Sequence, residues 1–398
     1  MAYVVIKLGG SVCAGPSSAP ILARIVALHR GRSVFVLSAL KGVTDRLIAF
    51  AAEQPSERRA AAFVAELKGE YLAFARAFKA PARAEAELEA RLDAGFGELL
   101  ACALGSASDR DRRIASFGER LSALAFCAAI AADDARAARE PGARSRRQTS
   151  GLAPCAFPEE LGLAAEGADP SDADCPDPGA AGPALRRALR AHRRFAVPGF
   201  YGVGPSGAVA LFGRGGSDYS AVALAAAAGA RLCVLYKDAL GICSAAPSLV
   251  DGVRRVPRLS YGEASALSAA GAKVLHPRTA ALAERHCVAL AVRPADGVGV
   301  SYVAPSKPRR SGPIAISLDR ERSEPGRGVR TVALIGEGVA TASACAVKAI
   351  KELERLGIAP RSLRFDPAGS ALRVDVPAES GVAALRGLHG AFFPRSAV

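Results

Sequence analysis

Gly213-Arg214-Gly215-Gly216-Ser217-Asp218-Tyr219-Ser220 is the turn around which this chain is organised. It follows a strand-like apolar segment, residues 207–212, and opens an apolar helix expected to include 221–229. Glycines let a backbone approach a ligand closely, and a helix N-terminus offers unpaired N–H groups to an anion. Arg214 can fork onto a carboxylate or phosphate, and Asp218 can serve a cation or an amine. The pattern predicts an anion site, with a purely structural strand–helix turn as the alternative.

Composition predicts a globular protein with a large core. The 398 residues allow two to three domains, and the chain is 50% hydrophobic and 23% charged. The net charge of +14 raises the question of nucleic acid. However, the arginines are scattered apart from clusters at 144–147 and 186–194, Trp is absent and aromatic residues are few. We therefore predict no nucleic-acid partner and interpret the charge as a solvated basic surface.

The cysteines and the N-terminus indicate a cytoplasmic protein. Nine cysteines, without a CxxC pair or metal-ligand spacing, are typical of reduced thiols. The chain enters an apolar strand directly after Met1, so we expect no signal peptide. The apolar runs at 124–132 and 221–229 are too short to span a bilayer, and we expect no membrane association.

Strand and helix patterns alternate along the first 300 residues. Apolar strands at 3–8 and 33–37 flank a helical pattern at 19–30, and this order predicts a mainly parallel α/β sheet sandwiched by helices. Residues 57–104 indicate an inserted helical hairpin, 116–132 a helix, and 141–183 a loop rich in Pro and Gly. Further elements are expected at 195–200 (strand), 232–236 (strand), 260–270 (helix), 277–285 (helix) and 288–292 (strand).

The C-terminal part predicts a second, smaller module. Residues 303–330 have the Pro, Arg, Ser and Gly content of a linker. Beyond it, strand, helix, strand, strand and helix patterns follow at 331–336, 343–356, 362–365, 371–376 and 380–389. This order fits a small α+β module of ferredoxin-like type. We therefore expect a catalytic domain over 1–302, a linker over 303–330 and one small module over 331–398.

Polar clusters lie where the predicted strands end. Lys7 precedes the glycine turn Gly9-Gly10-Ser11, the stretch Ser38–Thr44 ends the second strand, and Glu119 lies near an expected helix start. Lys273 lies in a further glycine-containing stretch, 271–277. Ligands of parallel α/β sheets bind outside the carboxyl ends of the strands. Each lysine alone has the properties of a surface residue, and Glu119 alone could be a helix-dipole partner. Together the clusters favour phosphoryl transfer from a nucleoside triphosphate.

With these motifs in place, the chain resembles the aspartate kinases of the amino acid kinase family. The resemblance covers residues 3–300 well and 331–393 more loosely. Its most specific parts are Gly213–Ser220 and Gly271–Pro277, the latter followed by Arg278-Thr279. Further motifs are Val5-Ile6-Lys7-Leu8-Gly9-Gly10-Ser11, Ser38–Asp45, Gly118-Glu119-Arg120-Leu121-Ser122 and Pro198-Gly199-Phe200-Tyr201-Gly202.

The resemblance implies ATP-dependent phosphorylation of the L-aspartate side-chain carboxylate, with Mg²⁺ between the phosphates and no metal site of the protein's own. Lys7 would stabilise the transferred phosphoryl group and Asp218 would organise the site. The residues that would hold aspartate are Thr44, Glu119, Arg214 and Ser217, with Arg214 on a carboxylate and Glu119 on the amino group or a polar neighbour. The nucleotide would contact Gly9, Gly10, Ser11, Gly215, Gly216, Lys237, Asp238 and Lys273.

Departures from the family pattern cluster in residues 237–248. Asp238 is kept, but Lys237 stands where the family usually has threonine, and Cys243, Ala246 and Ser248 replace tyrosine, aspartate and arginine. The amino-acid pocket thus matches the family while the nucleotide segment differs. Two alternatives follow: a weak or inactive homologue acting as a binding or regulatory subunit, or a member redirected to another carboxylate substrate.

The C-terminal module resembles an ACT module. Aspartate kinases typically carry two per chain, and residues 313–398 leave room for one. The resemblance implies that this shortened region serves homodimer contacts.

Overall fold

The computed structural model describes residues 3–140, 151–237, 241–272, 275–305, 312–319, 328–339, 343–366 and 369–394. The chain divides into two compact units. Unit 1 comprises Met1–Asp238 and Pro294–Gly297, and unit 2 comprises Ala239–Arg293 and Val298–Val398. This division falls inside the stretch 1–302 for which the sequence predicts one catalytic domain.

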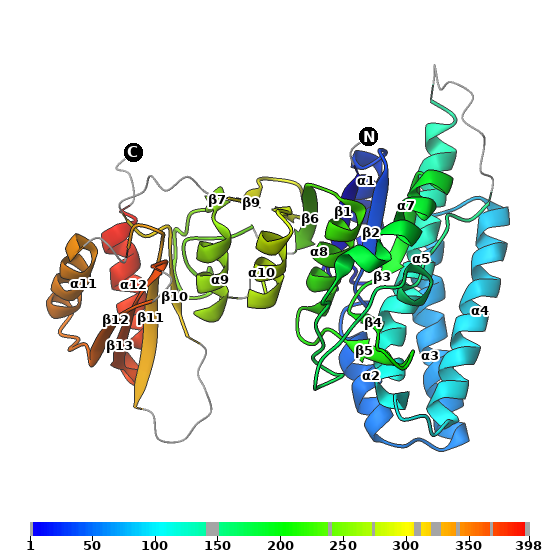
Figure 1. The fold of residues 1–398 in the computed structure, drawn as a ribbon, viewed down its shortest axis with the longest axis horizontal. Coiled ribbons are helices and arrows are strands. Elements are labelled where there is room, and N and C mark those ends of the chain that lie inside the picture. The colour runs from blue at the N-terminus through cyan, green and yellow to red at the C-terminus, as the bar shows by residue number, and fades with distance from the viewer. Residues whose placement is uncertain are drawn as a thin grey trace. The chain divides into compact units, whose positions relative to one another are not determined.

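Unit 1 is built on a parallel sheet, as the alternating sequence pattern predicts. Its strands run in the order β3-β2-β1-β6 and are all parallel (Figure 1). Every residue of β2 is buried, because a parallel strand in the middle of a sheet has helices on both faces. The strands are β1 (Val4–Leu8), β2 (Ser33–Leu37), β3 (Arg194–Pro198) and β6 (Leu232–Lys237).

The helices of unit 1 pack on this sheet and on each other. Helix α5 contacts β2 and β3, whereas α8 contacts β1 and β6. The predicted helical hairpin is confirmed as α3 and α4, which pack against each other and against α5 (Figure 1). The helices are α1 (Ala19–Leu28), α2 (Val43–Ala52), α3 (Glu57–Arg76), α4 (Ala82–Leu104), α5 (Arg110–Ala137), α6 (Pro158–Leu161), α7 (Gly182–Ala191) and α8 (Gly216–Ala228).

Shorter elements complete unit 1. Strands β4 (Tyr201–Val203) and β5 (Val209–Leu211) pair in an antiparallel hairpin, and two 3₁₀ turns cover Pro16–Ser18 and Pro178–Ala181. The predicted loop over 141–183 contains α6 and the second of these turns. Residues 141–150 of that loop lie outside the described residues.

Helix α5 corrects two predictions. It begins at Arg110, six residues before the predicted start at Ser116, so Glu119 lies in its third turn and not near its N-terminus. The helix-dipole interpretation of Glu119 is therefore wrong, since that effect is confined to the first turn. Among the described helices, α5 alone is long and apolar enough to cross a membrane, and 94% of its apolar window is buried inside the protein. That is the burial expected of a core helix.

Unit 2 contains a small antiparallel sheet with two helices. Its strands run in the order β10-β11-β13-β12, as expected for the predicted α+β module (Figure 1). Strand β10 lies within the predicted linker, so that part of the linker belongs to the module's sheet. The elements are β10 (Ala315–Leu318), β11 (Val329–Ile335), α11 (Ser343–Arg355), β12 (Ser362–Phe365), β13 (Ala371–Pro377), a 3₁₀ turn (Ala378–Ser380) and α12 (Gly381–Phe392).

The remaining elements of unit 2 precede this sheet in the chain. Strand β9 pairs parallel with β7 and antiparallel with β8. Ala245, inside the atypical segment 237–248, and Val250, just after it, pack into the core of the small module with Leu334 and Leu385. The elements are β7 (Arg258–Leu259), α9 (Tyr261–Ala269), α10 (Pro277–Arg285), β8 (Ala289–Pro294) and β9 (Ser301–Val303). All nine cysteines of the chain are free thiols.

Candidate active site

The centre of the site is a buried carboxylate held by two ammonium groups. Lys7 Nζ lies 2.6 Å from Asp218 Oδ1, and Lys237 Nζ lies 2.7 Å from Asp218 Oδ2. Lys7 and Asp218 are 7% and 5% exposed. Burial alone would raise the pKa of Asp218, but the charges of Lys237 and Lys7 overcome it and hold that pKa well below its usual range. Asp218 is therefore ionised at neutral pH.

Neighbouring elements bring these three residues together. Strands β1 and β6 pair in parallel with Lys7 opposite Leu235, so Lys7 and Lys237 both lie near the carboxyl ends of adjacent strands. Asp218 is the third residue of α8, in its first turn. Gly215 caps that helix with φ 77°, a left-handed conformation that glycine adopts without the penalty of a Cβ. The glycine turn thus delivers Asp218 to the ends of the strands.

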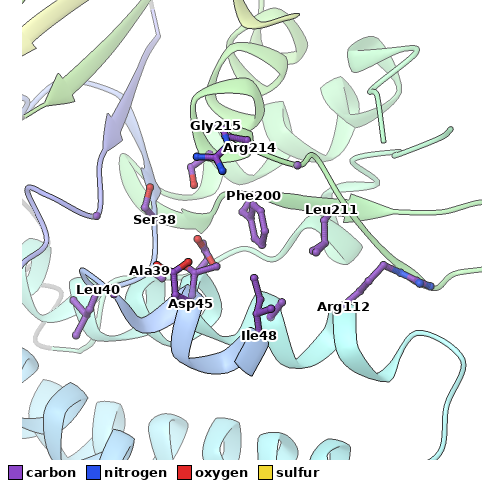
Figure 2. A pocket seen from close by; sticks show the side chains of 18 of the residues that line it. Ser38, Ala39, Leu40, Asp45, Ile48, Arg112, Phe200, Leu211, Arg214 and Gly215 are labelled. Carbon is purple, nitrogen blue, oxygen red and sulfur yellow. The ribbon is translucent and has the colours of Figure 1, made fainter. Parts of the chain in front are cut away.

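A cavity of about 820 Å³ opens next to this cluster (Figure 2). It lies within unit 1, between the Gly213–Ser217 turn, α2 and α5. Ten predicted site residues line it: Lys7, Gly10, Ser11, Thr44, Glu119, Arg214, Gly215, Gly216, Ser217 and Asp218. The structure therefore brings the predicted acceptor-binding residues together with the predicted catalytic pair.

The other predicted site residues do not line the cavity or lie outside the described residues. Gly9 adjoins the cluster, since a Cβ there would lie 3.3 Å from Lys7 Nζ. Lys237 is paired with Asp218 and does not line the cavity. Asp238 and Lys273 lie outside the described residues, so their predicted roles remain predictions.

Glu119 presents a buried carboxyl group to the cavity. Its side chain is 3% exposed, and its Oε2 atom has no hydrogen-bond partner within the described part of the chain. Burial raises the pKa of Glu119 to about 8, and the backbone around Ala39 and the charge of Lys7 lower it only in part. A buried carboxyl without a full set of partners can accept a cationic ligand group, because such a ligand would supply the missing charge and hydrogen bond.

Arg214 lies on the rim of the same cavity. It is exposed, and both Arg214 and Ser38 line the cavity (Figure 2). Thr44 belongs to the first turn of α2, and Ser217 to the first turn of α8. The site therefore offers a cation and hydroxyl donors around the anionic part of a ligand, and a carboxyl group for its cationic part.

Sequence reasoning missed an apolar wall of the cavity. Phe200, Ile48 and Leu211 come from three separate segments and point toward one another in Figure 2. Arg112 extends this wall and donates from Nε to the Val209 carbonyl at 2.8 Å. Phe200 has φ 76°, which is unusual for a residue with a Cβ, and its backbone N–H donates to Ser220 Oγ at 2.9 Å. Nothing in the sequence motif 198–202 signals this conformation.

The fold agrees with those of solved structures. Over 98% of this chain and all of the other, the structure matches E. coli aspartokinase III in complex with aspartate and ADP, with a TM-score of 0.76 and 20% identity. It matches the Clostridium acetobutylicum aspartate kinase over the same shares, with a TM-score of 0.75 and 17% identity. At these identities the likeness shows the fold alone.

Curated relatives match a shorter part of the chain. An aspartokinase of Thermus thermophilus is 37% identical over 139 residues, which is 34% of this chain and 34% of the relative. An aspartokinase of Geobacillus stearothermophilus is 42% identical over 109 residues, 27% of each chain. The chain thus aligns with about a third of the length of these relatives. The family model described as "Amino acid kinase family" matches residues 2–293, about three quarters of the chain. This chain belongs to the amino acid kinase family.

Proposed function

We propose that this protein phosphorylates the side-chain carboxylate of L-aspartate with ATP, giving 4-phospho-L-aspartate and ADP. The observation that carries the proposal is the shared cavity of Glu119, Arg214 and Lys7. A dicarboxylic amino acid needs an acidic partner for its ammonium group and a basic partner for its carboxylate. Glu119 supplies the first and Arg214 the second, and the aspartokinases among the relatives support the assignment.

The proposed reaction needs positioning and charge more than protein nucleophiles. A carboxylate oxygen of aspartate attacks the γ-phosphorus, and the bond to the β–γ bridging oxygen breaks with its electron pair leaving on ADP. Negative charge on the phosphoryl oxygens would be stabilised by Lys7, the ammonium group beside the cavity. Arg214, Thr44 and Ser217 orient the acceptor. Binding thereby meets the entropic cost of bringing the reactants together before the reaction step.

ATP and Mg²⁺ belong to the same proposal. Both oxygens of Asp218 are engaged by ammonium groups, so this carboxylate does not fit the role of a Mg²⁺ ligand. Mg²⁺ commonly binds through substrate phosphates and retained waters, and we expect it on the nucleotide. Among the described residues, we propose Gly9, Gly10, Ser11, Gly215 and Gly216 for the nucleotide side.

The test is a turnover assay with product identification. ADP release is measured with ATP and either aspartate, glutamate or N-acetylglutamate, and the acyl phosphate is trapped with hydroxylamine as a hydroxamate. We expect product with aspartate and more than about tenfold lower kcat/KM with the longer acceptors, since one methylene displaces the reacting carboxylate. Preference for another carboxylate would instead show a redirected enzyme. Aspartate binding by calorimetry without turnover would identify an inactive homologue.

The proposal extends to assembly and location. We propose a homodimer formed through the small module, in the cytoplasm. Strand β12 is an edge strand of its sheet and carries Phe365, a large apolar residue that is nearly half exposed. Analytical ultracentrifugation of Phe365→Glu beside the unaltered protein tests this. A wild-type monomer, or a dimer unaffected by the substitution, would contradict it.

A further inference from the structure

Lys237 holds the far side of the catalytic carboxylate. Its Nζ lies 2.7 Å from Asp218 Oδ2, while Lys7 holds Oδ1 at 2.6 Å. Lys7 and Asp218 both line the cavity, whereas Lys237 does not. Asp218 therefore links Lys237 to the cavity.

The charge balance of this cluster differs from that of a simple ion pair. Two ammonium groups share one carboxylate in a largely buried setting. With Lys237 removed, Asp218 and Lys7 would form a closed, neutral pair. A buried pair of that kind resists separation, because either partner left alone would be a buried, uncompensated charge.

We propose that Lys237 is a positioning residue that frees Lys7 for catalysis. Lys237 neutralises the charge of Asp218. Lys7 can therefore exchange its contact with Asp218 Oδ1 for the incoming phosphoryl oxygens without leaving a buried carboxylate without a counter-charge. The inference rests on the proposed function in one respect: Lys7 must meet a phosphoryl group. It gives the unusual lysine at this position a role in the cavity's chemistry without a direct contact to the nucleotide.

The competing possibility is that Lys237 binds the nucleotide directly, as the sequence suggested. The two roles differ in their dependence on Asp218. A lysine acting through Asp218 loses its influence when that residue is neutral, whereas a direct phosphate contact keeps it. A double-mutant cycle between Lys237 and Asp218 separates these cases.

The experiment combines kinetics with binding. The variants are Lys237→Met, Lys237→Gln and Lys237→Arg, with Asp218→Asn and the double variant Lys237→Met/Asp218→Asn. Lys68→Met is the matched control, because Lys68 Nζ also lies 2.7 Å from a carboxylate, that of Asp93, but on the exposed surface. Thermal unfolding establishes that each variant is folded, and Lys237→Gln replaces Lys237→Met if the latter is not. Each protein is assayed for aspartate phosphorylation and titrated with a non-hydrolysable ATP analogue.

For Lys237→Met we expect kcat to fall about 10- to 100-fold with KM for aspartate within about threefold, because the lost interaction is the one between Lys7 and the phosphoryl group and not a contact to aspartate. Lys237→Arg should restore most of kcat, and Lys68→Met should match the wild type. Affinity for the analogue should fall about tenfold in the wild-type background and less than about twofold in the Asp218→Asn background.

Equal losses of affinity in both backgrounds would establish direct nucleotide binding and overturn the inference. Unchanged kcat and affinity in Lys237→Met would overturn it as well. If the wild type binds the analogue but does not phosphorylate aspartate, the proposed acceptor is wrong while the binding cycle still decides the role of Lys237. A wild type that binds no analogue would overturn both proposals, since Lys7 would then have no phosphoryl group to meet.

Discussion

Lys7 Nζ and Asp218 Oδ1 lie 2.6 Å apart in a buried ion pair that joins the first strand of unit 1 to the first turn of α8. The pair fixes the glycine turn of residues 213–217 against the end of the sheet. It thereby couples the stability of that turn to the charges that we assign to catalysis.

Removing either charge is expected to stop the reaction. For Lys7→Met and Asp218→Asn we expect turnover to fall about 10²- to 10³-fold, because each variant removes a preorganised charge at the reacting group. Circular dichroism and thermal unfolding show whether the fold persists. Asp218→Asn is preferred to alanine, since an amide fills the same space. Turnover like that of the wild type in a folded variant of either residue would refute their assignment.

Arg214→Lys is expected to impair aspartate use far more than nucleotide binding. A lysine keeps the positive charge but loses the planar fork that binds a carboxylate through two parallel hydrogen bonds. We expect KM for aspartate to rise about tenfold or more, with the affinity for an ATP analogue nearly unchanged. Steady-state kinetics and calorimetry measure the two quantities. An unaltered KM and kcat would mean that the carboxylate clamp lies elsewhere.

Glu119 is expected to make stability depend on pH. Its folded-state pKa of about 8 lies above the ordinary value of 4.5, so the fold favours the protonated carboxyl. This contribution is complete below about pH 4.5 and is lost as the pH rises toward 8, with a slope of at most about 1.4 kcal/mol per pH unit.

Glu119→Gln is neutral at every pH and should remove that slope. Urea unfolding of both proteins between pH 5 and pH 9 gives the difference in the free energy of unfolding, in which other titrating groups cancel. The difference should shift in favour of the variant as the pH rises. A constant difference across this range would show that the carboxyl is not buried in an uncompensated state.

Gly118→Ala is expected to destabilise unit 1. A Cβ at Gly118 would lie 2.7 Å from the Ala39 Cβ, so α5 or the segment after β2 would have to shift. We expect a loss of about 1–3 kcal/mol, as for other overpacked cores. Gly97 in α4 is the matched control, since a Cβ there has no neighbour within 4 Å, and Gly97→Ala should gain about 0.5–1 kcal/mol. Equal stability of the two variants in urea unfolding would refute the close contact.

The bounds of an element were predicted correctly where a local sequence signal marks its end. Helix α10 has the predicted bounds because Pro277 occupies its first position, where the missing N–H costs nothing. Helix α5 was predicted too short because all four residues of its first turn, Arg110–Arg113, are charged and its middle is buried on all sides. A helix with both features shows no 3.6-residue periodicity to follow.

The sequence predicted those site residues that belong to recognisable motifs. Glycine turns and charged residues at strand ends pointed to Lys7, Arg214 and Asp218. The convergence of Lys7 and Lys237 on the same carboxylate depends on the adjacency of β1 and β6, which are separated by most of unit 1 in the sequence. The φ of Phe200 is equally non-local, since it reflects the packing of Gly216 against Phe200, where a Cβ would lie 3.0 Å from the ring.

The burial of α5 also determines how slowly its backbone amides exchange with solvent. A core helix exposes its amides to solvent only when the whole unit opens, so hydrogen exchange at Glu119 should be as slow as global unfolding. The side chain of Arg214 is exposed, so it can change its conformation without any opening of the fold. The two ends of the proposed acceptor therefore contact side chains that differ in mobility. The ammonium end of aspartate would meet a group that keeps its place for the lifetime of the fold, and the carboxylate end would meet a side chain that can reorient while the protein stays folded.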